Sequence, residues 1–223
     1  MKNALVEETH WEKAAKTKMG KYLTEIEADF VSEKIDLEKL KLVMDVGAEA
    51  GRFSIFAANK NVEVVGIDID SYGLKRLRLK NKQVVLVQAD ARYIPLKDDL
   101  LDAIFMIEVL DYIPELETAL AECLRTLKSE GSLILSFGND SSLKSKLRRL
   151  RGKSYMHSYR EITRTLKKVD FRTTKKAGYN WLPFGRTSEN RLIPLLARIE
   201  GLFGLRRFPR FSPWVIIHAV KSG

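Results

Sequence analysis

The sequence has little of what disulfide- or metal-stabilised proteins rely on. Of its 223 residues one is a cysteine, Cys123, and three are histidines. A single cysteine excludes an intrachain disulfide framework and a cysteine-based metal cluster, so no metal site is expected. No stretch approaches the roughly 18 apolar residues of a membrane span, and the first residues lack the apolar core of a secretory signal. We therefore expect a cytoplasmic, non-spanning protein.

Acidic residues are scarce in one part of the chain. Residues 144–210 contain 19 lysines and arginines against 4 acids, whereas the rest of the chain carries a net charge of −5. Such asymmetry is typical of proteins that contact a polyanion: nucleic acid, an anionic membrane surface or an acidic small molecule. A solvated basic face without any partner is the alternative.

Short apolar runs alternate with amphipathic segments along most of the chain. Strands are predicted at 41–45, 62–68, 83–90, 101–107, 131–137, 171–179 and 213–221. Helices are predicted at 10–34 (interrupted near Gly20), 52–59, 72–81, 115–127, 141–153, 158–169 and 190–203. This alternation indicates an α/β fold with a mostly parallel sheet and helices on both faces.

We expect a single domain over residues 1–223. Within it, residues 1–40 form an N-terminal helical lid and residues 41–140 form a ligand-binding core. Residues 141–223 form a basic elaboration that holds a helical insertion and the last strands. The insertion falls between the sixth and seventh predicted strands, which is a natural place for a substrate lid.

Acids stand at the ends of three successive predicted strands: Asp45, Asp68 and Asp90. Because the carboxyl ends of parallel strands meet at one edge of the sheet, these side chains should border one site. A carboxylate at the position of Asp68 suits two ribose hydroxyls, and one at Asp90 suits an adenine amino group. The pattern favours an adenosine-containing ligand.

The loop after the first strand contains two glycines, Gly47 and Gly51, and an acid, Glu49. The glycines allow a tight turn and a close approach to a ligand, and the following helix start favours a charged group there. Glu49 and Asp45 would repel the pyrophosphate of a dinucleotide, whereas an ammonium group would be attracted. An adenosyl compound that bears an amino acid is therefore favoured over a dinucleotide.

These segments resemble a known family. The loop "VMDVGAEAGRFS", the strand "VVGIDID" and the block from "VQADARYIP" to "GSLILSF" resemble the class I S-adenosylmethionine-dependent methyltransferases, especially the small-molecule branch related to quinone biosynthesis. The resemblance covers residues 42–137 strongly and the tail hardly at all. It implies a Rossmann-like fold with a seven-stranded sheet, S-adenosylmethionine as cofactor and methyl transfer as reaction.

The resemblance also implies a set of cofactor-binding residues. They are Asp45, Gly47, Ala48, Glu49 and Gly51 in the loop, Asp68 and Ile69 after the second strand, Asp90 and Ala91 after the third, and Glu108 after the fourth. By this resemblance Asp45 and Gly47 shape the pocket for the methionine end, Ile69 packs on the adenine, and Glu108 lines the methyl region. Glu49 departs from the family, because it replaces the middle glycine of an Asp-x-Gly-x-Gly-x-Gly loop.

Two residues are candidates for contact with the methyl acceptor. Transfer from a sulfonium mainly requires positioning and exclusion of water, with a general base where the acceptor is a hydroxyl or an acidic carbon. His157 precedes a predicted capped helix, and Tyr112 follows the fourth strand. Either could face the acceptor from the cofactor side of the sheet.

The basic tail bears on the identity of the acceptor. We expect in-line methyl transfer to a small metabolite, lipid-like or acidic, with an RNA or protein methyltransferase as the alternative. Mixed basic and apolar residues suit a membrane surface or a lipid-like acceptor. They also suit a phosphate backbone, with Trp181, Phe208 and Phe211 as stacking platforms. Peripheral membrane contact and the oligomeric state stay open.

Overall fold

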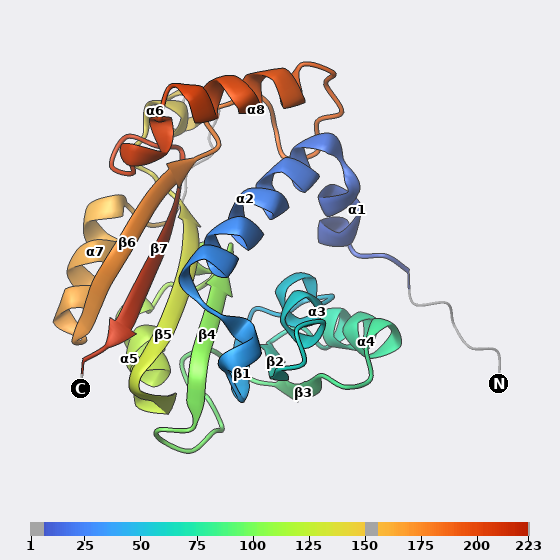
Figure 1. Cartoon of the computed structure of the whole chain (residues 1–223), viewed down its shortest axis with the longest axis vertical. Helices are drawn as coiled ribbons and strands as arrows, with labels where there is room; N and C mark the ends of the chain where they lie inside the picture. Colours follow the sequence, from blue (N-terminus) through green and yellow to red (C-terminus); the bar gives the residue numbers. More distant parts are fainter. Residues whose placement is uncertain (1–6, 150–155, 223) are drawn as a thin grey trace.

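Seven strands form one sheet in the order β3-β2-β1-β4-β5-β7-β6 (Figure 1). The computed structural model describes residues 7–149 and 156–222. The strands are β1 (Leu42–Val46), β2 (Glu63–Asp68), β3 (Val85–Gln88), β4 (Leu101–Ile107), β5 (Leu127–Gly138), β6 (Phe171–Tyr179) and β7 (Trp214–Lys221). β7 runs antiparallel to both of its neighbours, and β1 to β5 are mutually parallel. The predicted seven-stranded, mostly parallel sheet is confirmed.

Helices cover both faces of this sheet. They are α1 (His10–Lys16), α2 (Lys18–Lys34), α3 (Arg52–Ala58), α4 (Ser71–Lys80), α5 (Leu116–Thr126), α6 (Leu143–Arg149), α7 (Tyr159–Lys168) and α8 (Ile193–Leu202). Three short 3-10 helices are η1 (Leu37–Lys39), η2 (Leu110–Tyr112) and η3 (Leu205–Arg207). Side chains of α2, α3 and α4 join one buried cluster, and those of α5 and α7 join the other. In β4, Phe105 belongs to the first cluster while Ile104 and Met106 belong to the second, as the period of two requires.

The N-terminal helical segment breaks at a different residue from the one predicted. Thr17 separates α1 from α2 and caps α2, since its hydroxyl accepts the N–H of Gly20 at 3.1 Å. Gly20 itself lies inside α2, where a Cβ would come within 2.0 Å of the Ala14 carbonyl oxygen. The glycine is thus needed for close packing of the two helices. Residues 150–153 of the predicted basic helix lie outside the described residues.

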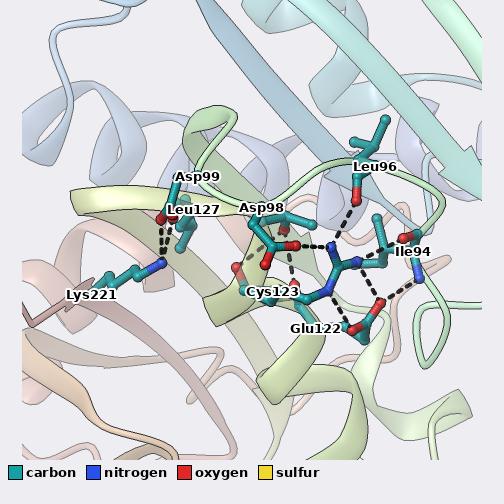
Figure 2. A network of polar contacts seen from close by, with 10 residues as sticks. Ile94, Leu96, Asp98, Asp99, Glu122, Cys123, Leu127 and Lys221 are labelled. Atoms are coloured by element: carbon teal, nitrogen blue, oxygen red, sulfur yellow. Dashed lines mark hydrogen bonds and ion pairs between the residues drawn. The ribbon is translucent and has the colours of Figure 1, made fainter.

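One arginine holds the segment after β3 against α5. The Arg125 guanidinium donates to the carbonyls of Ile94 and Leu96, each at 2.8 Å. It also pairs with Asp98 at 2.6 Å and with Glu122 at 2.8 Å. Figure 2 shows these labelled groups converging from the loop and the helix. The clamp therefore ties the segment between β3 and β4 to the end of α5, next to the amino ends of β4 and β5.

The predicted helical insertion is confirmed, because α8 lies between β6 and β7 along the chain. Figure 1 shows α8 and α6 beyond the carboxyl ends of the parallel strands, at the top of the molecule. Across the described parts of the chain, no helix combines the length and the apolar character needed to traverse a bilayer. The insertion therefore stands over the sheet edge at which the acids were expected.

Candidate functional site

A cavity of about 2150 Å³ opens at the carboxyl ends of the parallel strands. Segments that follow β1 to β4 form one side, and α1, α6 and the segment between β6 and α8 contribute the rest. Nine of the ten predicted cofactor residues line it: Asp45, Gly47, Ala48, Glu49, Asp68, Ile69, Asp90, Ala91 and Glu108. Gly51 does not, because it faces α4, where an added Cβ would meet Leu77 at 2.2 Å.

The loop after β1 is held to β2 by its backbone. The N–H groups of Gly47 and Ala48 both donate to the Ile67 carbonyl, at 2.9 and 3.0 Å. Gly47 has a φ of +73°, and a Cβ there would lie 2.4 Å from the Val109 side chain. Left-handed backbone and lack of space together require glycine at this turn. The loop is therefore tight and fixed before any ligand arrives.

Glu49 occupies the left-handed region as well, with a φ of +46°. That conformation suits the glycine it replaces, and it costs about 1 kcal/mol for a residue with a Cβ. Its carboxylate accepts the N–H of Ala50, two residues before α3, and so provides a partner for this backbone donor in the turn. The side chain is half-buried and lines the cavity rather than turning out to solvent.

Asp68 joins two turns through its carboxylate. One oxygen accepts the N–H of Glu49 at 2.8 Å and the other accepts the N–H of Asp70 at 2.8 Å. Each carboxylate oxygen has a second lone pair, so both can still accept a hydroxyl from the cavity. Ile69, next in sequence, is 69% exposed and offers a flat apolar surface beside it. The arrangement is suited to a ribose with an adjoining base.

Asp90 has a partner that the sequence reading did not include. Arg92 binds its carboxylate through two guanidinium nitrogens, at 2.7 and 3.0 Å, and Arg92 also pairs with Glu115 at 2.8 Å. The side-chain and backbone hydrogen bonds of Arg92 lower the pKa of Asp90. Asp90 is therefore an oriented, ionised acceptor at the cavity wall.

Asp45 is the most deeply buried of the strand-end acids. It accepts the Ser54 hydroxyl at 2.6 Å, and burial raises its pKa to about 6 although this hydrogen bond opposes the rise. It carries charge at neutral pH and little below pH 6. Asp45 thus places a buried negative charge beneath the loop without a cation in direct contact.

Glu108 belongs to a network of charged side chains and one phenol that we call the glutamate–arginine network: Glu27, Arg52, Glu108, Tyr179 and Arg186. Arg52 links the two glutamates, at 2.6 Å from Glu27 and 3.1 Å from Glu108. Arg186 pairs with the other oxygen of Glu108, and Tyr179 donates to Glu27 at 2.5 Å. Both oxygens of Glu108 are therefore engaged by guanidinium groups at the cavity wall.

His157 lies away from the cavity lining. It is buried, with Nδ1 3.0 Å from the Glu161 carboxylate and Nε2 3.0 Å from the Ile113 carbonyl. Both ring nitrogens are occupied by partners that fix the start of α7. These contacts anchor the start of α7, and a catalytic role of His157 stays a prediction. His10, on α1, does line the cavity.

Tyr112 does line the cavity and is 64% exposed. Partial burial raises its pKa, and the charges of Asp111 and Glu108 act in the same direction. The phenol is thus protonated at neutral pH, and it can donate a hydrogen bond to an acceptor molecule more readily than it can remove a proton. The same cavity is also lined by the apolar side chains of Leu143, Leu147, Met156 and Phe211, and by the polar side chains of Asp111 and Lys144.

The N-terminal helices reach the cavity from the opposite side. Glu12 of α1 pairs with Arg76 of α4 at 2.9 Å, and the guanidinium of Arg186 lies 5.3 Å from the Trp11 ring centroid. The Thr17 hydroxyl donates to the Arg186 carbonyl at 3.0 Å. The lid predicted over residues 1–40 therefore contacts the segment before α8, and residues 1–6 lie outside the described part.

Sequence reasoning missed the cationic half of the site. The sequence analysis did not predict roles for Arg52, Arg92 and Arg186, because no sequence pattern indicates which residue an arginine in a loop or at a helix start will pair with. The partners of Arg52 lie 25 and 56 residues away. Only Arg92, two residues from Asp90, offered a local signal. No group of three acids, histidines or cysteines among residues 7–149 and 156–222 is arranged to hold a metal ion.

Residues 44–135 match a family described as "Methyltransferase domain". The ubiquinone biosynthesis O-methyltransferase of Xanthomonas oryzae is 31% identical over 120 residues, which cover 51% of this chain and 49% of that protein. The 24-methylenesterol C-methyltransferase 3 of Arabidopsis thaliana is 26% identical over 215 residues, which cover 83% and 60%. These matches span about half of the length of the curated relatives, or slightly more.

A solved structure extends the similarity to most of the chain. The magnesium protoporphyrin IX methyltransferase of Synechocystis, which was crystallised with S-adenosylhomocysteine, superposes with a TM-score of 0.67. The alignment covers 97% of this chain and 89% of that one at 18% identity. At this level of identity the likeness concerns the fold, and it includes the elements outside residues 44–135.

Proposed function

We propose that the chain is a class I S-adenosylmethionine-dependent methyltransferase and that it transfers a methyl group to a small acceptor with an apolar, lipid-like body. The observation that carries the proposal is the composition of the cavity. Acids stand at the strand ends, and the residues contributed by α6 and by the segments around α8 include exposed apolar side chains, among them Leu143, Leu147 and Phe211, beside polar ones such as Lys144 and Asn180. The acids suit an adenosyl amino acid, and the exposed apolar side chains suit an acceptor with an apolar body.

The residues of the cavity fit S-adenosylmethionine. Asp68 has free lone pairs for the ribose hydroxyls, Ile69 provides an apolar face for the adenine, and Asp90 is an oriented acceptor for its amino group. Around the loop, Asp45 and Glu49 are complementary to the ammonium and sulfonium charges of the cofactor. A pyrophosphate would be repelled by the same two acids.

When bound, S-adenosylmethionine supplies a methyl group that is already activated by its sulfonium. The chain therefore has to orient an acceptor in line with that methyl group and to exclude water. We propose that Tyr112 orients the acceptor by a hydrogen bond, and that α1 and the segment before α8 close the cavity. The contact between Arg186 and Trp11 supports the closing role.

The apolar acceptor side supports the lipid-like class. Leu143 and Leu147 of α6 are 72% and 58% exposed, and both line the cavity together with Met156 and Phe211. Exposed apolar side chains at a cavity mouth are stabilised when an apolar ligand covers them, by about 25 cal/mol for each Å². A polar acceptor would gain no such stabilisation from these four side chains.

Cofactor binding is tested first, by titration calorimetry with S-adenosylhomocysteine and with NADH. We expect binding of the former only. Methylation is then measured with methyl-labelled S-adenosylmethionine and phenols or carboxylic acids with and without alkyl chains. Turnover should rise with alkyl length. Label in added RNA but in none of these compounds would contradict the proposed acceptor class.

A pair of variants separates the two halves of the site. Leu147→Ser should raise the KM for alkylated acceptors several-fold while the affinity for S-adenosylhomocysteine stays unchanged. Leu79→Ser is the matched control, because Leu79 is 64% exposed on α4 and does not line the cavity. Equal effects of both changes would remove the support for Leu147 as an acceptor contact.

A further inference from the structure

The helix α8 presents apolar side chains to solvent instead of burying them. Leu192, Leu195, Ile199 and Leu202 follow a spacing of three or four residues and share one helix face, and Phe203 extends it. Their exposed fractions include 85% for Leu202 and 73% for Phe203. We call this set the apolar stripe.

The orientation of α8 is fixed by its opposite face. Glu200 is buried there and accepts the Tyr22 hydroxyl at 2.6 Å and the Trp181 backbone N–H at 3.1 Å. Ile193, on the same side, is also buried. Rotation that buried the apolar stripe would expose Ile193 and break both hydrogen bonds of Glu200. The contacts of Glu200 and Ile193 therefore keep the apolar stripe exposed to solvent.

Cations surround the apolar stripe. Five arginines of the segment 189–211 are exposed: Arg191, Arg198, Arg206, Arg207 and Arg210. None of these guanidinium groups forms an ion pair with a carboxylate of the described chain. The segment contains two acids, of which Glu200 is buried and only Glu189 is exposed. We call the five residues the arginine fringe.

The same surface reaches the cavity mouth. Phe211, one residue after Arg210, is 61% exposed and lines the cavity together with Leu143 and Leu147 of α6. Figure 1 places α8 and α6 together at the end of the molecule beyond the parallel strands. An occupant of the surface would thus lie beside the acceptor side of the cavity.

We propose that the apolar stripe and the arginine fringe dock the protein on an anionic lipid bilayer. Apolar side chains would enter the boundary between headgroups and acyl chains, and the guanidinium groups would bind lipid phosphates. A second copy of the chain fits less well, because a symmetric contact would bring two arginine fringes together. Docking itself does not depend on the proposed function. Only the idea that docking brings a lipid-like acceptor to the cavity rests on it.

The test is co-sedimentation with lipid vesicles, without cofactor or turnover. We expect binding to vesicles with 30% phosphatidylglycerol in phosphatidylcholine, little binding to pure phosphatidylcholine, and weakening by salt. Leu202→Ser/Phe203→Ser and Arg206→Gln/Arg207→Gln should each reduce the partition coefficient about tenfold or more. None of these four residues lines the cavity.

Matched controls separate this surface from general charge. Arg160→Gln/Arg164→Gln removes two exposed arginines from α7, and Leu79→Ser removes an exposed leucine from α4. Both should bind vesicles like the unchanged protein. Equal losses of vesicle binding in the controls and the test variants would overturn the proposal. It would also be overturned if light scattering showed a dimer that the Leu202→Ser/Phe203→Ser change converts to monomers.

The two proposals can fail separately. Affinity for S-adenosylhomocysteine, measured without vesicles, should be the same in all of these variants. Vesicle binding without cofactor binding would support the proposed docking surface and contradict the proposed function. Cofactor binding without vesicle binding would contradict the docking proposal and leave the proposed function intact. Binding of the segment to an RNA homopolymer in place of vesicles would have the same meaning.

Discussion

At the scale of single residues, the loop after β1 depends on a glutamate in a left-handed conformation. Glu49 has a φ of +46°, which an alanine would share with the same strain and without the hydrogen bond to Ala50. We expect Glu49→Gly to be more stable than Glu49→Ala by about 1 kcal/mol, because glycine adopts this region freely. Urea denaturation of the two variants measures the difference. Equal stabilities would mean that the loop relaxes to another path.

The side chain of Glu49 has a second expected effect, on the ligand. If its carboxylate attracts the cofactor's ammonium, then both variants should bind S-adenosylhomocysteine more weakly by a similar factor, whatever their stabilities. A stability difference without an affinity change would restrict the residue to the local hydrogen bond with Ala50.

Asp68 gives the sharpest test of a single contact. Its two oxygens accept one backbone N–H each, and an asparagine has only one oxygen to offer. Asp68→Asn should therefore leave one amide unpaired, misorient the loop and lower the affinity for S-adenosylhomocysteine about 10- to 100-fold. Calorimetric titration measures this loss.

A distant carboxylate serves as the control for Asp68. Glu130→Gln removes a charge from an exposed ion pair with Arg172, far along β5 from the cavity lining, and should leave the affinity unchanged. If Asp68→Asn bound the cofactor as tightly as this control, the ribose assignment would be lost.

At the scale of elements, the clamp around Arg125 determines how firmly the segment between β3 and β4 is held against α5. Arg125→Ala removes the hydrogen bonds of the guanidinium group to the Ile94 and Leu96 carbonyls. It also removes the ion pairs with Asp98 and Glu122. We expect a loss of about 2 kcal/mol in the free energy of unfolding and faster amide exchange over residues 91–100. Arg172→Ala, which breaks one exposed ion pair, should cost less than about 1 kcal/mol. Similar losses for both would argue against the clamp.

Strands and helices were predictable because their apolar spacing is a local property. The continuous runs of β1, β4 and β7 and the stripe of α5 are each complete within about a dozen residues. The differences lie where tertiary contacts decide. β5 begins at Leu127, four residues before the prediction, because Leu127 pairs with Leu101 although polar residues follow it. Likewise, the helix breaks at Thr17 because the Thr17 side chain caps α2. The sequence prediction placed the break at Gly20, because glycine is the more familiar helix breaker.

The candidate site was predictable to the extent that it follows strand ends. Asp45, Asp68 and Asp90 border one cavity because parallel strands end at one edge. Their roles toward a cofactor stay predictions. The pairing of Glu108 with Arg52 and Arg186 was not predictable, since it joins residues 56 and 78 positions apart. His157 illustrates the reverse case: its position near a capped helix predicts a base, whereas the partners of its ring nitrogens, Glu161 and the Ile113 carbonyl, could be found only from the structure.

At the scale of the whole molecule, the glutamate–arginine network makes stability depend on pH. Burial and the charge of Glu108 raise the pKa of Glu27 to about 7, although Arg52 and Tyr179 oppose the rise. The unfolded chain has the ordinary lower pKa, so the folded state binds the extra proton and loses stability as the pH rises through 7. Between pH 6.5 and 8.5 we expect a fall of about 1 kcal/mol that Glu27→Gln abolishes.

Urea denaturation at the two pH values measures this fall. Other buried groups titrate mostly below the window: burial raises the pKa of Asp45 to about 6 and lowers that of His218 to about 4. Asp45→Asn should therefore retain most of the fall, which makes it a suitable control. A fall that persists in Glu27→Gln would assign the effect to another group.

The position of β7 has a consequence for the order in which the chain becomes organised. β6 is hydrogen-bonded only to β7, and β7 lies between β5 and β6. During synthesis β6 therefore has no strand to join until residues 214–221 have left the ribosome, whereas β1 to β5 can pair as they emerge. Asn139, just after β5, adds to this dependence, since its side chain binds the carbonyls of Arg210 and Ser212. A newly made chain would hold the strand-end acids of the cavity first, and the lining contributed by residues 143–214 would assemble last.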